Sequence, residues 1–180
     1  MKRFTITLFL LCLYVISFAQ DIRFTGVPLG INIKEFKEKL IEKGYTFNES
    51  LSNKGEGHDV YYFSGIFAGS CANLSITTTP KSKLVSAISV AFEDFTTEKT
   101  NYENIKNKYN EIKTSLKNKY PNASLNDWSN GYIINATTFK FGDCGINLTI
   151  QEHSSNKTLN LLYVDFNITN KAKKEFEEDY

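Results

Sequence analysis

The amino-acid sequence predicts an α+β protein built from two tandem αβββ repeats, with an antiparallel sheet or sheets and with the helices packed on one side. Two observations support this prediction. Residues 36–92 and 112–166 carry matching blocks in the same order, with one cysteine at the corresponding place in each copy. Within each copy, a segment with helical periodicity precedes three segments rich in β-branched and aromatic residues.

The matching blocks are clearest around the two cysteines. Gly-Ser-Cys-Ala-Asn-Leu-Ser-Ile at 69–76 corresponds to Gly-Asp-Cys-Gly-Ile-Asn-Leu-Thr-Ile at 142–150, where the second copy has one extra residue after its cysteine. Blocks that keep their order and spacing are typical of an internal duplication, the alternative being two similar αβ stretches in a chain rich in Lys and Asn. The other matched blocks are 36–45 with 112–120, 88–93 with 162–167 and, more weakly, 50–51 with 124–125.

Each copy is expected to begin with an amphipathic helix. Apolar residues recur at helical spacing after Asn32, a suitable N-cap, and stop before Gly44, which predicts a helix over 33–43. In the second copy the same spacing continues until Pro121 and predicts a longer helix over 101–119. The apolar positions of the two helices are Ile33, Phe36, Leu40 and Ile41 in the first and Tyr102, Ile105, Tyr109, Ile112 and Leu116 in the second.

Three strands are expected after each helix. They are joined by connections of only a few residues, and because a parallel crossover needs a dozen residues or more, the strands should be antiparallel. The charged segment 170–180 is expected to be either a frayed amphiphilic helix or disordered. The predicted strands are 60–67, 73–79 and 84–92 in the first copy and 132–141, 146–152 and 158–166 in the second.

The first residues have the features of a secretory signal peptide. Lys2 and Arg3 precede an apolar run over 8–16, and Ser17-Phe18-Ala19 supplies the small-x-small pattern before a cleavage site. A membrane anchor is the alternative, but the run is short against the roughly 30 Å of a bilayer core. We therefore expect an exported protein, periplasmic or secreted. The expected organisation is a signal peptide at 1–19, repeat 1 at 20–97, repeat 2 at 98–169 and a charged C-terminal tail at 170–180.

The charge balance gives no sign of a nucleic-acid or membrane partner. The whole chain has a formal net charge of +1, and loss of Lys2 and Arg3 with the leader would change it to about −1. Nucleic acid and anionic membrane surfaces attract basic chains, so neither partner is expected. No later apolar stretch is long enough for a transmembrane helix, so we expect no membrane insertion after signal cleavage.

Two cysteines remain after the leader, Cys71 and Cys144. Exported chains usually oxidise such a pair, and a bridge closing so long a loop would stabilise the fold by roughly 4 kcal/mol. We therefore expect a disulfide between Cys71 and Cys144, provided that the two corners of the fold meet. If the copies instead join edge to edge in one sheet, the corners could lie at opposite ends and both thiols would remain, as small apolar side chains; the third alternative is a bridge between two molecules.

The sequence contains no motif of a catalytic, metal or cofactor site. His58 and His153 are the only histidines, and neither lies in a cluster with metal-ligand spacing. The pattern Gly-x-Ser-x-Gly of serine hydrolases and phosphate-binding glycine loops are also absent. We expect no catalytic residue, no metal and no cofactor, and hence not an enzyme.

Aromatic residues are the strongest indication of a binding surface. They make up 14% of the chain, and Tyr61-Tyr62-Phe63 places aromatic rings on both faces of one strand, because successive side chains alternate. Only one face can pack against the helices, so the other should expose rings that anchor a partner. Trp128 lies in a polar segment, where it either anchors a partner or folds back onto the core. The candidate binding residues are Tyr61, Tyr62, Phe63, Trp128 and Tyr132.

With its leader and its two helix-plus-sheet copies over 36–166, the chain resembles the beta-lactamase inhibitory protein family in architecture. It resembles more loosely the small outer-membrane assembly lipoproteins and the PepSY modules. The resemblance implies binding of proteins or peptides rather than catalysis. The chain departs from the inhibitor family, in which each repeat closes its own disulfide, because each copy here has a single cysteine, so no functional residue is transferred by position.

We therefore expect an exported, non-enzymatic binding or inhibitory module whose aromatic sheet face contacts a protein, a peptide or a glycan. The first alternative is a cell-envelope assembly or scaffold protein, which would co-purify with membrane complexes. The second is a small hydrolase around His58 or His153, which would require a buried pocket with a perturbed histidine.

Overall fold

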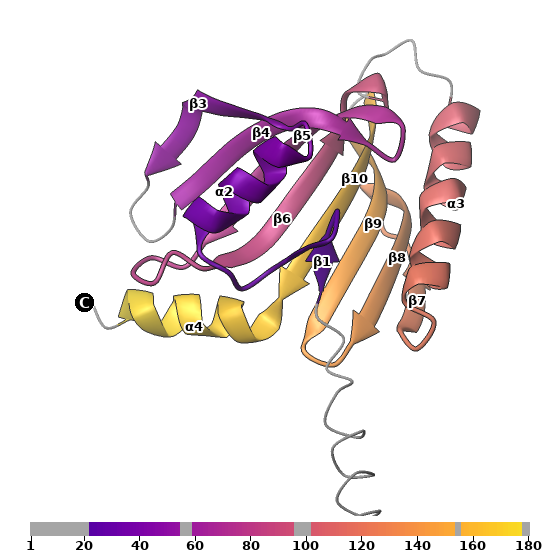
Figure 1. Ribbon diagram of the computed structural model, residues 1–180. Helices are drawn as coiled ribbons and strands as arrows, with labels where there is room; N and C mark the ends of the chain where they lie inside the picture. Colours follow the sequence, from indigo (N-terminus) through magenta and orange to yellow (C-terminus); the bar gives the residue numbers. More distant parts are fainter. Residues whose placement is uncertain (1–21, 55–58, 96–101, 154–155, 178–180) are drawn as a thin grey trace, which may run out of the picture.

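A computed structural model describes residues 22–54, 59–95, 102–153 and 156–177. The predicted signal peptide and His58 lie outside the described residues. The fold is α+β, with three helices packed against one antiparallel sheet of eight strands (Figure 1). The strands of this sheet are β3 (Thr46–Lys54), β4 (Asp59–Phe67), β5 (Ser70–Thr78), β6 (Val85–Phe92), β7 (Ser124–Trp128), β8 (Ile133–Phe141), β9 (Cys144–His153) and β10 (Asn156–Asp165). The remaining elements are β1 (Arg23–Phe24), β2 (Val27–Pro28), α2 (Ile33–Glu42), η1 (Glu93–Phe95), α3 (Tyr102–Lys119) and α4 (Phe166–Glu177).

The strand order of the sheet is β3-β4-β5-β6-β10-β9-β8-β7. The first four strands and the last four each form an antiparallel meander, and the two meanders meet where β6 pairs with β10. This central pairing is antiparallel and aligns Val90 with Leu161. Within the described residues, all eight strands therefore lie side by side in a single sheet rather than in two sheets packed face to face.

Helix α2 forms where the sequence predicts it. The Asn32 side chain accepts a hydrogen bond from the Lys34 backbone N–H at 3.0 Å, which caps the first turn. The helix ends before Gly44, whose φ of +86° is a left-handed conformation that glycine adopts at little cost. Phe36 and Leu40 point to the sheet and are fully buried.

The core lies between the sheet and helices α2 and α3. Alternate residues of the central strands, such as Val90 and Leu161, face this side and are 0% exposed. Helix α3 contributes a stripe that begins with Ile105 and ends with Leu116. Burying each such side chain stabilises the fold by about 1.5–3 kcal/mol. Helices α2 and α3 thus cover the same face of the sheet, as expected (Figure 1).

The structure adds elements that the sequence analysis did not anticipate. Helices α2 and α3 are each followed by four strands rather than the predicted three. The additional strands are β3 and β7, which form the two edges of the sheet. The short hairpin of β1 and β2 lies in front of the sheet and buries Phe24. For the charged tail, the sequence left a helix and disorder as alternatives; the described part, up to Glu177, is helical, and helix α4 starts directly after β10.

Candidate functional site

The face of the sheet opposite α2 and α3 is formed by the alternate residues of each strand. One row of cross-strand neighbours on this face runs from β4 to β7, and we call it the middle row. Its members are half-buried or exposed, and none carries a charge. The middle row consists of Tyr62, Ser75, Ser89, Leu162, Asn147, Thr138 and Asn126.

Trp128 is held over the same face by hydrogen bonds. It is the last residue of β7 and lies opposite Ala136, one row above the middle row. The indole Nε1–H donates to the Thr138 hydroxyl at 3.2 Å, and this hydroxyl donates to the Asn147 side-chain oxygen at 2.6 Å. The indole is still 37% exposed, so the hydrogen bonds orient a ring that a partner can contact. Trp128 therefore does not fold back onto the buried core.

The five predicted binding residues do not form one cluster. Tyr62 lies in the middle row, but six strand spacings separate β4 from β7, so Tyr62 and Trp128 are about 29 Å apart across the sheet. Tyr132 is 76% exposed in the turn between β7 and β8. Phe63 is 1% exposed and belongs to the core, and Tyr61 points to the same side as Phe63. Two of the five residues thus share the open face.

The two cysteines are not joined by a disulfide. Cys71 lies on β5 and Cys144 on β9, with β6 and β10 between them, so their Cα atoms are at least about 14 Å apart. A bridge requires about 7 Å or less. Cys71 and Cys144 also face opposite sides of the sheet. Successive side chains of a strand alternate between the two faces, and Leu74 and Leu148 are both buried on the helix-covered side. Cys71 is three residues from Leu74 and so faces away from that side, whereas Cys144 is four residues from Leu148 and faces it. Joining of the halves edge to edge is the reason why the expected bridge is not formed.

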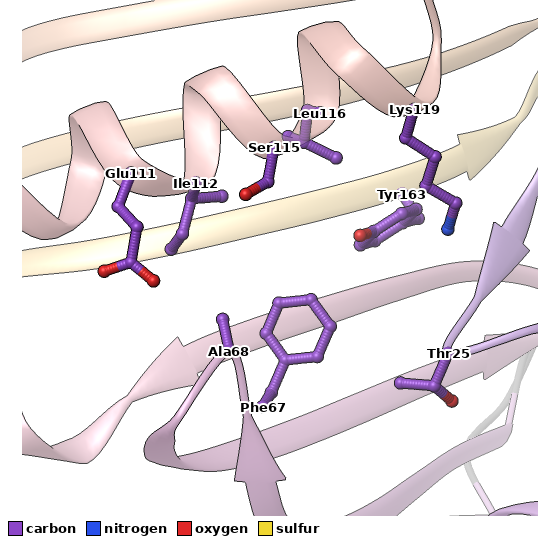
Figure 2. Close-up of a pocket in the computed structure, with 9 residues that line it drawn as sticks. All are labelled: Thr25, Phe67, Ala68, Glu111, Ile112, Ser115, Leu116, Lys119 and Tyr163. Carbon is purple, nitrogen blue, oxygen red and sulfur yellow. The ribbon is translucent and has the colours of Figure 1, made fainter.

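A groove opens on the helix-covered side, between α3 and the turn that joins β4 to β5 (Figure 2). Its volume is about 170 Å³. The walls are largely apolar, and the exposed residues at the rim are Ala68 of the β4–β5 turn and Glu111, Ser115 and Lys119 of α3. One end of the rim is fixed by Lys108, which binds the Ala68 carbonyl and Glu111. The lining residues are Thr25, Phe67, Ala68, Glu111, Ile112, Ser115, Leu116, Lys119 and Tyr163.

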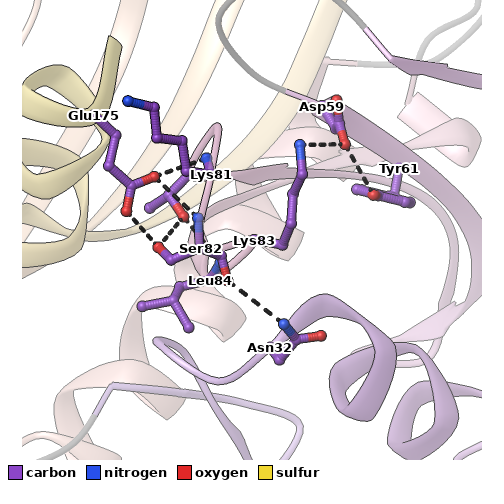
Figure 3. A network of polar contacts seen from close by, with 9 residues as sticks. Asn32, Asp59, Tyr61, Lys81, Ser82, Lys83, Leu84 and Glu175 are labelled. Atoms are coloured by element: carbon purple, nitrogen blue, oxygen red, sulfur yellow. Dashed lines mark hydrogen bonds and ion pairs between the residues drawn. The ribbon is translucent and has the colours of Figure 1, made fainter. Parts of the chain in front are cut away.

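A network of polar side chains fixes the turn between β5 and β6 (Figure 3). On one side, Asp59 accepts a hydrogen bond from the Tyr61 hydroxyl at 3.1 Å and forms an ion pair with Lys83 at 3.0 Å. Asp59 is only 6% exposed, so this ion pair satisfies a buried carboxylate. The hydroxyl of Tyr61, one of the predicted binding residues, is thus engaged within the protein.

On the other side of this turn, Glu175 anchors helix α4. Its carboxylate accepts hydrogen bonds from the backbone N–H of Lys81 at 2.8 Å and of Ser82 at 3.1 Å, and from the Ser82 hydroxyl at 2.5 Å. Burial alone would raise the pKa of the Glu175 carboxyl. The hydrogen bonds from Ser82 and Lys81, together with the charge of Lys171, outweigh burial and hold this pKa below its usual value.

Replacing Glu175 with glutamine is expected to lower the free energy of unfolding at pH 7 by about 1–2 kcal/mol, because the charged acceptor of three hydrogen bonds is lost. A carboxyl whose folded pKa is depressed stabilises the fold above its unfolded pKa, near 4.5, and this contribution is lost as the pH falls through the folded pKa. The difference between the two proteins should therefore shrink between pH 7 and pH 3 in urea unfolding. Glu177→Gln, on the exposed side of the same helix, should change stability by less than about 0.5 kcal/mol. A pH-independent difference would contradict this assignment.

The described residues show no cluster of three or more His, Cys, Asp or Glu side chains that could hold a metal ion. His153 ends strand β9, and His58 lies outside the described residues. In the described parts of the chain, no helix is long and apolar enough to cross a membrane.

Comparisons of this chain with known protein families, with curated proteins and with solved structures find no match. Any functional conclusion therefore depends on the geometry of the chain itself. Sequence reasoning found Tyr62 and Trp128 but missed the small polar residues between them. Their signal was the period-two alternation within the predicted strands, which assigns Ser75 and Ser89 to the face opposite the buried residues.

Proposed function

We propose that the protein is an exported, non-enzymatic binding module that holds a protein partner on the open face of its sheet. The observation on which this proposal rests is the uncharged middle row, which runs from β4 to β7, with the oriented indole of Trp128 at one side. Buried centres of protein interfaces are depleted in charged residues, and tryptophan and tyrosine are the residues that most often anchor them.

The size of the face supports a protein partner over a small molecule. Eight strands at about 4.8 Å spacing are roughly 34 Å across, and three rows of side chains extend roughly 20 Å along the strands. The resulting area, roughly 700 Å², is close to the ~800 Å² that each partner buries in a standard protein interface. A short peptide or a glycan would cover only part of this surface.

The proposal of export is supported by the basic, apolar and small-x-small pattern over 1–19. We also propose that the two halves of the sheet descend from a duplicated unit of one helix and four strands. The symmetric strand order about the β6–β10 pair and the matched sequence blocks support this origin. The unit proposed is thus one strand longer than the sequence alone indicated, because the edge strands β3 and β7 are included.

The experiment is to recover partners from the envelope and the medium of the source cells, purify any protein recovered and measure its affinity for three variants. Ser89→Arg places a long charged side chain in the centre of the middle row, and Trp128→Ala removes the oriented indole. Each should weaken binding at least about tenfold, because charges are disfavoured in interface cores and aromatic anchors dominate binding energy. Asn110→Arg, at an exposed position of α3, is the matched control and should leave the affinity unchanged.

A partner that binds the Ser89→Arg variant as tightly as the unmodified protein would show that the open face is not the interface. Circular dichroism and urea unfolding of each variant would confirm that the fold is retained. If the recovered ligand is a glycan or a short peptide whose binding depends on Trp128 in the same way, the open face is still the binding surface, but the proposed protein partner is wrong.

A further inference from the structure

The groove beside α3 contains a tyrosine hydroxyl group that faces the open space between its walls. The Tyr163 side chain is 2% exposed and lies on β10, at the floor of the groove. Figure 2 shows its oxygen pointing into the space between α3 and Phe67. Within the described part of the chain, no hydrogen bond of this hydroxyl is found. Its oxygen is not among the buried side-chain atoms that lack a partner, so the hydroxyl reaches the space of the groove, where a ligand oxygen can accept its hydrogen bond.

The ring of Tyr163 is held rigidly, so the direction of its hydroxyl is fixed. It packs edge-on against Phe24 with ring centroids 5.4 Å apart. Burial raises the pKa of Tyr163 far above its ordinary value, and the nearby Tyr120 and Tyr45 raise it further. The hydroxyl therefore keeps its proton near neutral pH and can donate to an oxygen atom in the groove.

The size and lining of the groove suit one small ring. Its volume is about 170 Å³, slightly above the roughly 150 Å³ of an apolar cavity that binds benzene. Phe67, Ile112 and Leu116 provide apolar walls around the Tyr163 hydroxyl. A charged ligand would lose its hydration between these walls, so a neutral molecule is favoured.

The charged groups at the rim are engaged within the protein at the two ends of the groove. Glu111 forms an ion pair with Lys108 at 3.0 Å. At the other end, the Lys119 ammonium donates to the Arg23 carbonyl at 3.3 Å. Neither group points a charge at the middle of the groove; the Tyr163 hydroxyl points into it from the floor, and the Ser115 hydroxyl lies at its mouth.

From these features we infer that the groove is a binding site for a small neutral phenol, a single aromatic ring that bears a hydroxyl group. The ring lies between Phe67 and the Ile112–Leu116 stripe, and its oxygen accepts a hydrogen bond from the Tyr163 hydroxyl. The site is on the helix-covered side of the sheet and is independent of the open face, so either proposal can fail without the other.

The test is a titration of the purified protein with phenol and, separately, with benzene. Binding is measured from the changes in the protein's NMR chemical shifts as the ligand concentration rises. Tyr163→Phe keeps the ring and removes the hydroxyl, so it should weaken phenol binding about fivefold and leave benzene binding within about twofold. Ser115→Phe fills the mouth of the groove from an exposed helix position and should weaken both ligands at least about tenfold. Thr114→Phe, on the adjacent exposed position outside the groove, is the matched control and should change neither.

Three results would overturn the inference. The first is a phenol titration that never saturates in the unmodified protein. The second is equal phenol affinity in the Tyr163→Phe variant, which would show that the hydroxyl does not contact the ligand. The third is binding that survives Ser115→Phe, which would place the ligand elsewhere.

Discussion

Replacing Phe24 with alanine is expected to lower the free energy of unfolding by about 3–5 kcal/mol, enough to unfold a marginally stable domain. The Phe24 ring is 0% exposed and belongs to the buried core. It stacks on Phe67 at 5.1 Å, meets Tyr163 edge-on at 5.4 Å and packs against Tyr45 at 6.0 Å. Tyr45 lies directly before β3 and Phe67 ends β4, in the first meander, whereas Tyr163 lies on β10, in the second. The loss of the Phe24 ring therefore removes contacts to both meanders at once.

Urea unfolding at neutral pH measures this effect as a shift of the midpoint with an unchanged slope. Ile41→Ala is the matched control, since it also truncates a large apolar side chain but at a position 49% exposed. It should cost less than about 1 kcal/mol. A Phe24→Ala protein as stable as the Ile41→Ala protein would show that the β1–β2 hairpin does not hold the two halves together.

The strongly periodic elements could be predicted from the sequence because burial on one side leaves a clear pattern. The predicted helix at 33–43 is observed as Ile33–Glu42, and the predicted strand at 132–141 as Ile133–Phe141. In both, a stripe or an alternate set of apolar residues is buried against the core. The antiparallel direction of the strands also followed from the short connections.

The edge strands were missed for the opposite reason. All five residues of β7 are exposed, so this strand has no alternation of buried and exposed positions that a sequence pattern could reveal. Edge strands of soluble proteins are commonly short and polar, which limits unwanted pairing with other chains. The polar stretch Asn126-Asp127-Trp128 therefore carries no strand pattern, and the sequence alone does not place Trp128 on the open face.

The open face was only half predictable. Alternation along Tyr61-Tyr62-Phe63 indicated that one ring would face away from the helices, and that ring is Tyr62. The relative positions of Tyr62 and Trp128 depend on the order of the eight strands, which sequence periodicity does not determine. For the same reason, the groove at Tyr163 could not be inferred, because it brings together α3, β10, the β1–β2 turn and the β4–β5 turn.

Replacing Gly65 with alanine is expected to destabilise the fold by about 3 kcal/mol, although it adds a single methyl group. A Cβ atom at this position of β4 would lie 2.5 Å from Cδ1 and 2.9 Å from Cε1 of Tyr45. The ring of Tyr45 cannot move away freely, since it is 5% exposed and its hydroxyl donates to the Ile66 carbonyl at 3.1 Å. Burial raises the pKa of Tyr45 to about 12, so this donor stays protonated through the neutral range. Overpacking of a close-packed site costs about 1–3 kcal/mol, and the short distances place Gly65 at the upper end.

Gly131→Ala is the matched control, because a Cβ atom there has no atom within 4 Å. It should change stability by less than about 0.5 kcal/mol. Combining Gly65→Ala with Tyr45→Leu separates crowding from a general intolerance of β4 to alanine, since the smaller side chain leaves room for the new methyl group. If crowding by Tyr45 is the cause, Gly65→Ala should cost less than about 1 kcal/mol in the Tyr45→Leu background, a coupling of about 2 kcal/mol between neighbouring sites. An unchanged cost in that background would mean that the backbone of β4, rather than the ring above it, requires glycine.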